Sequence, residues 1–70
     1  MDLVDKIIAY ETGELPNDEI IELFSELIQN GQAWSLQGSY GRMANSFIEQ
    51  GILSKNGFIN WDIYHDLINA

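Results

Sequence analysis

Apolar residues recur at helical spacing in several stretches of the chain, and glycine, proline or asparagine separates one stretch from the next. In the first stretch, from Asp2 to Thr12, intervals of three or four residues place the apolar side chains on one helix face. Asp2 and Asp5 would lie in the first turn, where the helix dipole favours negative charge, and Gly13 would end the helix. The apolar stripe consists of Leu3, Val4, Ile7 and Ile8.

The second stretch has the widest apolar face and is predicted to be the most deeply buried helix. It runs from about Asp18 to Gln29, after a linker that contains the only proline, Pro16. Asn17 is the expected N-cap, with Asp18 as the alternative, because a short polar side chain can accept a hydrogen bond from the first turn. An asparagine-glycine pair after Gln29 would end the helix. Its apolar face comprises Ile20, Ile21, Leu23, Phe24, Leu27 and Ile28.

The segment from Gln32 to Gly41 allows two interpretations. A short helical turn around Trp34 comes first, and two glycines three residues apart follow it. The chain either breaks near Gly38, with Ser39 as the N-cap of the next helix, or continues as one helix packed very closely on a neighbour. We favour the break, because each glycine inside a helix costs about 1 kcal/mol relative to alanine.

The next predicted helix runs from about Ser39 to Gln50 and stops at Gly51. Its apolar residues, which we expect to be buried, are Tyr40, Met43, Ala44, Phe47 and Ile48. Combined with the preceding helix, this pattern predicts a central core of Leu23, Phe24, Leu27, Met43 and Phe47.

The last part of the chain predicts a minimal hairpin followed by a helix. Asn56-Gly57 is a strong signal for a two-residue hairpin turn, which Leu53 and Phe58 would flank. Asn60 would cap a helix from Trp61 to about Asn69. The expected fold is therefore all-α, a single small domain over residues 1–70 with three to four helices.

Charge and composition narrow the choice of partner. The 70-residue chain has a net charge of −8, and its only lysines and arginines are Lys6, Arg42 and Lys55. Nucleic-acid binding and binding to anionic membranes both depend on cationic side chains, so we expect no nucleic acid, no membrane and instead a protein partner. There is no cysteine, no signal-peptide pattern and no apolar run of membrane length, and the expected location is the cytoplasm of a bacterial host cell.

The block from Ala33 to Ala44, AWSLQGSYGRMA, resembles a set of small phage-encoded proteins that share an AW-x-LQG-x-YGR-x-A core. In those uncharacterised proteins a helix of the Glu22-Leu23-Phe24 type leads into the block. The resemblance covers residues 3 to 53 and leaves the last predicted helix outside. It implies a short acidic helical domain in a phage or prophage setting, where such proteins often bind and redirect host or phage machinery.

Two groups of residues are candidate protein-binding surfaces. The first consists of Trp34, Gln37, Tyr40 and Arg42, because tryptophan, tyrosine and arginine dominate binding hot spots. In the alternative interpretation, the two aromatic rings pack in the core and the arginine pairs with a carboxylate of the second helix or with a helix C-terminus.

The second candidate surface is acidic. Asp18, Glu22 and Glu26 are four residues apart on one face of the second helix, and Glu22 and Glu26 would meet a basic partner. The alternative is a solvated face without a binding role.

No residue pattern indicates catalysis, a metal site or a cofactor. His65 has only Asp62 and Asp66 near it, whereas a metal site needs three or four ligands at fixed geometry. The serines lack a recognisable base, and no glycine-rich segment matches a phosphate-binding loop. We therefore expect a protein that is not an enzyme.

The leading hypothesis is a small acidic protein-interaction module that acts as an adaptor or inhibitor. One alternative is a helix-turn-helix or winged-helix DNA-binding regulator, in which Gln37, Ser39 and Arg42 would follow the turn and Asn56-Gly57 would form a wing. Another is an inhibitor that mimics DNA. A homodimer through the last helix is also expected, unless that helix closes the core of the monomer.

Overall fold

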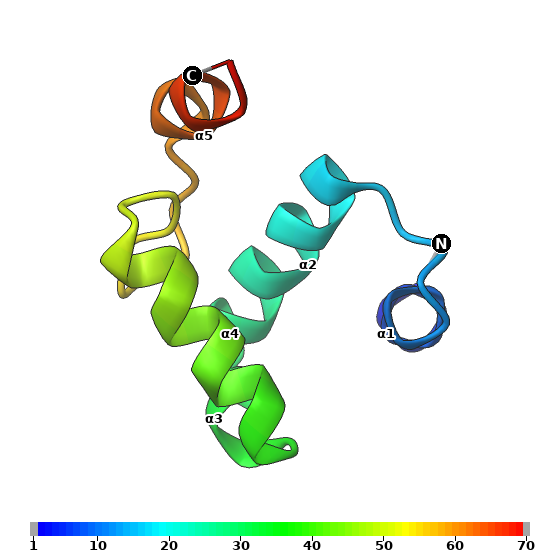
Figure 1. The fold of residues 1–70 in the computed structure, drawn as a ribbon. Coiled ribbons are helices and arrows are strands. Elements are labelled where there is room, and N and C mark those ends of the chain that lie inside the picture. The colour runs from blue at the N-terminus through cyan, green and yellow to red at the C-terminus, as the bar shows by residue number, and fades with distance from the viewer. Residues whose placement is uncertain (1, 70) are drawn as a thin grey trace.

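Five helices make up most of residues 2–69, the part of the chain that the computed structural model describes (Figure 1). The all-α prediction is confirmed, and the turn predicted at Trp34 is a short helix of its own. The helices are α1 (Leu3–Glu11), α2 (Asn17–Gln29), α3 (Gln32–Ser35), α4 (Gly38–Glu49) and α5 (Trp61–Ile68).

The core forms around α2, which the apolar pattern predicts to be the most deeply buried element. Ile21, Leu23, Phe24 and Leu27 are almost completely inaccessible to solvent. The rings of three aromatic residues surround Phe24 with centroids 5.4–5.9 Å away, in edge-to-face and stacked arrangements that stabilise cores. These three residues are Tyr10 on α1 and Tyr40 and Phe47 on α4.

Met43 is not part of this core, contrary to the prediction, because its side chain is 37% exposed. On α4 the inward positions are Tyr40 and Ala44, four residues apart, with Phe47 partly buried against the same cluster. Met43 precedes Ala44 and lies at the edge of this face, where it lines a surface groove.

The chain breaks between α3 and α4, but the N-cap position is two residues earlier than expected. Leu36 is extended and α4 begins at Gly38, so the N-cap position is Gln37 rather than Ser39, and no side chain caps the helix. Gly41 lies inside α4 and faces α3. A Cβ atom there would lie 3.6 Å from the carbonyl oxygen of Ala33, which is ordinary van der Waals contact, so the packing of α4 on α3 does not require a glycine at this position.

Side chains cap the first and the last helix; the cap at Asn60 was predicted, whereas the sequence pattern placed Asp2 in the first turn of α1 and not at its N-cap. The Asp2 carboxylate accepts a hydrogen bond from the Asp5 amide, and the Asn60 side chain accepts one from the Ile63 amide. Asn17 does not cap α2, because the helix already includes it and the extended residue before the helix is Pro16. The fixed φ of proline restricts the direction in which the chain enters the helix, without a side-chain hydrogen bond.

The hairpin at Asn56-Gly57 has a three-residue turn instead of the predicted two-residue turn. The Ser54 amide donates a hydrogen bond to the Phe58 carbonyl, and the Gly57 amide, at a residue with a left-handed φ of +89°, donates one to the Ser54 carbonyl. This geometry matches the turn-plus-bulge type of hairpin. Leu53 pairs with Ile59, so Phe58 is left 75% exposed.

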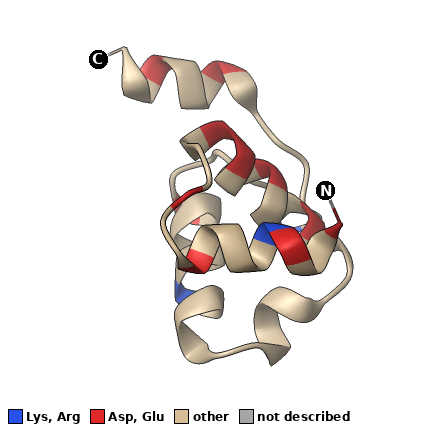
Figure 2. Cartoon of the chain, turned by 90° about the vertical axis from the view of Figure 1, so that its right-hand side faces the viewer, with Lys and Arg blue, Asp and Glu red and all other residues tan. Residues whose placement is uncertain are grey.

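The helix α5 stands apart from the other four helices in both Figure 1 and Figure 2. None of its residues is fully buried, although Trp61, Ile63 and Tyr64 pack in part against the core. No helix within residues 2–69 has the length and apolar character needed to cross a membrane.

Candidate functional site

The predicted patch around Trp34 is divided between the surface and the core. Trp34 is 50% exposed on α3, and Gln37 and Arg42 are exposed at the start of α4. Tyr40 is buried with Phe24 and Tyr10. The two interpretations of this patch therefore each describe some of its residues, and only three of the four side chains are available to a partner.

Trp34 and Arg42 lie close to the glycines of α4. Atom Cε3 of the indole would be 3.8 Å from a Cβ at Gly41, and the Arg42 guanidinium would be 3.2 Å from one at Gly38. The described residues form one ion pair, between Lys6 and Glu26, so the pairing suggested for Arg42 is absent among them. Arg42 thus remains a candidate for binding.

Tyr40 connects α4 to α1 through its hydroxyl group. The hydroxyl donates a 2.6 Å hydrogen bond to a carboxylate oxygen of Glu11. Burial of the phenol, followed by the hydrogen bond and the negative charge of Glu11, raises the pKa of Tyr40 well above its ordinary value. The folded chain therefore strongly favours the neutral form of this tyrosine.

Replacing Tyr40 with phenylalanine should change how stability depends on alkaline pH. The raised pKa means that Tyr40 contributes its full stability below about pH 10, and that this contribution is lost as pH rises toward the folded-state pKa. Tyr40→Phe should lower the free energy of unfolding by about 1 kcal/mol at pH 7. Above about pH 10, the free energy of unfolding should fall less steeply with pH in this variant than in wild type. Urea melts at neutral and alkaline pH test this, with Tyr64→Phe as the control. An equally steep decline in Tyr40→Phe would contradict it.

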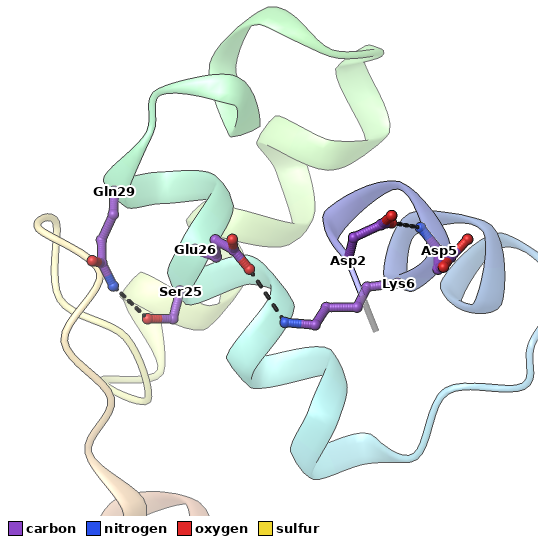
Figure 3. Close-up of polar contacts among 6 residues, drawn as sticks. All are labelled: Asp2, Asp5, Lys6, Ser25, Glu26 and Gln29. Carbon is purple, nitrogen blue, oxygen red and sulfur yellow. Dashed lines mark hydrogen bonds and ion pairs between the residues drawn. The ribbon is translucent and has the colours of Figure 1, made fainter.

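The acidic stripe of α2 is partly covered by α1. Figure 3 shows Lys6 reaching from α1 to Glu26, with 3.4 Å between its Nζ and the carboxylate oxygen. Asp18 and Glu22 remain exposed on the same helix. Glu26 therefore has a partner within the chain, and the part of the stripe open to a basic partner is centred on Glu22.

Exposed apolar side chains on the two terminal helices form a second kind of surface, and the sequence interpretation had selected the last of these helices as the contact of a homodimer. Neither α1 nor α5 contains a fully buried residue. Val4 and Ile8 on α1 are 64% and 55% exposed, and Leu67 and Ile68 on α5 are 49% and 56% exposed. Each helix thus presents exposed apolar side chains to solvent, and such surface is a candidate interaction site.

The α5 surface faces a groove between this helix and the α2–α4 pair. The groove has a volume of about 330 Å³, and no charged residue lines it. A second, wider hollow lies beside the hairpin, and its lining includes Lys55, Asp62 and the exposed ring of Phe58. The first groove is lined by Tyr10, Asn17, Ile20, Ile21, Met43, Phe47, Gln50, Ile52, Tyr64, Leu67 and Ile68.

The hairpin that carries α5 is fastened to α2. The buried hydroxyl of Ser25 donates a hydrogen bond to the Gly57 carbonyl, and Gln29 donates a 3.0 Å hydrogen bond to the Ser25 oxygen. Figure 3 shows the Ser25–Gln29 part of this contact beside the hairpin. The segment before α5 is thus anchored to the core while α5 itself is set apart.

Residues 2–69 give little support to a metal site or to a buried polar binding site. No group of three or more histidine, cysteine, aspartate or glutamate side chains there is placed to hold a metal ion. Every buried side-chain nitrogen or oxygen in this part of the chain has a hydrogen-bond partner, so no polar group is left aimed at an unoccupied cavity. The surfaces described above are therefore the principal candidates for function.

Comparison with known proteins places the chain in a family. Neither the curated proteins nor the solved structures contain a match to this chain. A family model matches residues 1–68 and so includes α5, which the resemblance to phage-encoded proteins had left outside. The chain belongs to the family described as Domain of unknown function (DUF7417).

Proposed function

We propose that the protein is a small acidic interaction module that binds another protein through exposed apolar surface. The observation that carries this proposal is the exposure of Val4, Ile8, Leu67 and Ile68 by about half or more on helices with no fully buried residue. A domain of this size has a small hydrophobic core, and apolar side chains that remain in water do not contribute to its stability. Burial of these side chains against a partner would recover that free energy.

The nature of the partner follows from the charge and from the resemblance of the Ala33–Ala44 block. A net charge of −8 favours association with a basic protein and repels polyanions. The resemblance to phage-encoded proteins supports a role in a phage or prophage, as an adaptor or inhibitor of a host or phage protein in the host cytoplasm. Binding, rather than catalysis, is the proposed activity.

A DNA-binding regulator is the second candidate, favoured by the order of the elements. The helices α2, α3 and α4 followed by a hairpin have the order of a winged helix, with α4 in the place of the recognition helix. The surface charge argues against it, because Lys6 pairs with Glu26 and leaves Arg42 and Lys55 as the cationic side chains without an ion pair among residues 2–69. Acidic positions predominate on the face shown in Figure 2.

Affinity capture with surface variants tests the proposed function. The tagged protein is incubated with nuclease-treated lysate of the cells that carry its gene. We expect wild type to retain one protein in stoichiometric amount, and the double variant Val4→Ser/Ile8→Ser or Leu67→Ser/Ile68→Ser to lose it. The exposed polar pair Ser39→Ala/Asn45→Ser on α4 serves as the matched control.

The captured protein is then purified and titrated by calorimetry at several temperatures. A negative heat-capacity change is expected, since it is the signature of apolar burial on binding. Retention of the same protein by both apolar double variants would refute the proposal. Capture that occurs only without nuclease treatment would instead favour the DNA-binding candidate.

A further inference from the structure

The groove beside α5 has the lining of a binding site for an apolar helix face. Its eleven lining residues are all uncharged, and three of them, Met43, Leu67 and Ile68, are also among the large exposed apolar side chains of the chain. Its volume of about 330 Å³ lies at the small end of the range for ligand sites. It can therefore take up several apolar side chains rather than a large compact ligand.

The walls of the groove indicate the shape of its occupant. Residues of α2 and α4, such as Ile20 and Phe47, form the floor, and Tyr64 and Leu67 of α5 form a wall. A helix with apolar residues at intervals of three or four can lay its side chains between such walls, as amphipathic helices do in hydrophobic grooves. A bound helix would place α5 in a packed bundle, where Figure 1 shows it separated from the others.

The charged residues near the groove indicate whether its occupant is cationic or anionic. Three exposed carboxylates, Asp18, Glu49 and Asp66, are next in the chain to a lining residue, as are one arginine, Arg42, and His65. Glu11 is not counted because it is bound to Tyr40, and Glu19 and Glu22 are not counted because they line a separate hollow with Lys6. Electrostatic attraction across an interface requires opposite charges, whereas like charges brought together repel each other.

A second copy of this chain fits these charges poorly. It would bring another net charge of −8 and the same carboxylates toward the groove. The homodimer expected from the sequence would therefore have to overcome this repulsion, while a cationic helix would meet attraction at the rim and apolar burial at the floor.

We infer that the groove between α5 and the α2–α4 pair binds an amphipathic helix of a partner protein whose polar face carries lysine or arginine. This inference rests on the proposed function and specifies its site and the chemistry of the partner. The apolar face of the helix fills the groove, and its cationic face meets Asp18, Glu49 and Asp66.

Fluorescence anisotropy with designed peptides tests the inference. The probe is a labelled helical peptide of about five turns, with leucine at positions i, i+3, i+4 and i+7 and lysine at the polar positions. A second peptide replaces each lysine with glutamate, and a third keeps the lysine composition but scrambles the leucine spacing. We expect only the first peptide to bind wild type, with an affinity that decreases as salt concentration rises.

Two variants locate the binding surface. Leu67→Ser removes an exposed apolar side chain from the groove wall and should weaken binding about tenfold. Phe58→Ser removes an exposed apolar side chain from the hairpin, outside the groove and outside the surfaces of α1 and α5, and should leave the affinity unchanged. Glu49→Gln with Asp66→Asn should weaken binding about threefold and reduce its salt dependence.

Each contrary result has a definite meaning. Failure of the lysine peptide to bind, or equal binding to Leu67→Ser, overturns the groove assignment but leaves the lysate result standing, so the two proposals can fail separately. Equal binding of the glutamate peptide overturns the choice of a basic partner. Sedimentation that shows a dimer dissociated by Leu67→Ser also overturns the inference, because a second copy would then occupy the groove.

Discussion

Replacing Phe24 with alanine is expected to abolish the cooperative fold at room temperature. Phe24 is inaccessible to solvent at the centre of the core, and its ring meets those of Tyr10, Tyr40 and Phe47. Deletion of a buried phenylalanine side chain costs about 3–5 kcal/mol. At roughly 0.05–0.15 kcal/mol of stability per residue, a 70-residue domain has about 3.5–10.5 kcal/mol in total, and at the lower end of this range the loss removes all of it. Urea titration followed by far-ultraviolet circular dichroism measures the effect.

Phe58→Ala is the matched control, because it removes the same side chain from a position that is 75% exposed. We expect its unfolding free energy to stay within about 0.5 kcal/mol of wild type. Phe47→Ala should fall between the two, since Phe47 is only partly buried against the core. A cooperative melt of Phe24→Ala near that of wild type would show that the core is not centred on α2.

Local signals in the sequence were sufficient to predict most helix boundaries. Asp2 and Asn60 cap α1 and α5 through hydrogen bonds within a few residues, which depend little on the rest of the fold. Gly13, Gly31 and Gly51 follow α1, α2 and α4 with positive φ, as a glycine after a helix usually does. Periodicity likewise identified α2 as the central helix.

Long-range packing was not predictable in the same way. The apolar pattern of α5 shows that one face of this helix is suited to burial, but it does not tell whether the covering surface belongs to the same chain. Leu67 and Ile68 therefore resemble ordinary core residues in the sequence, although they are exposed beside the groove. Met43 was wrongly assigned to the core for a related reason. It is adjacent to Ala44 on α4, and a small difference in direction around the helix axis places its side chain at the groove edge instead of in the core.

The candidate site also combines features that the sequence predicts with features that depend on long-range packing. Residue types alone selected Trp34, Gln37, Tyr40 and Arg42, but the burial of Tyr40 depends on Phe24, Tyr10 and Glu11, which are distant in the sequence. The apolar residues of the last helix, compared with the small size of the core, were the reason to expect a homodimer through this helix, and they are also the signal for the groove. That comparison indicates excess apolar surface without giving its location.

Replacing Gly57 with alanine is expected to have the second largest effect, because the backbone and the surroundings both exclude a side chain there. Gly57 has a φ of +89°, and a residue with a side chain adopts this conformation at a cost of about 1–2 kcal/mol in backbone energy. A Cβ atom would also lie 2.7 Å from the carbonyl oxygen of Ser25 and 2.7 Å from Cγ of Gln29. The hairpin would have to move away from α2, at an overpacking cost of about 1–3 kcal/mol.

Gly13→Ala separates these two costs. Gly13 has a similar φ of +77°, but no atom lies within 4 Å of the position that an alanine Cβ would take, so only the backbone cost applies. We expect Gly57→Ala to lower the unfolding free energy by about 2–5 kcal/mol and Gly13→Ala by about 1–2 kcal/mol. Displacement of the hairpin would also break the Ser25–Gly57 hydrogen bond and release the segment that carries α5. Amide hydrogen exchange in α5 should therefore accelerate in Gly57→Ala and not in Gly13→Ala; equal exchange and equal melts in the two variants would show that the hairpin does not hold α5 in place.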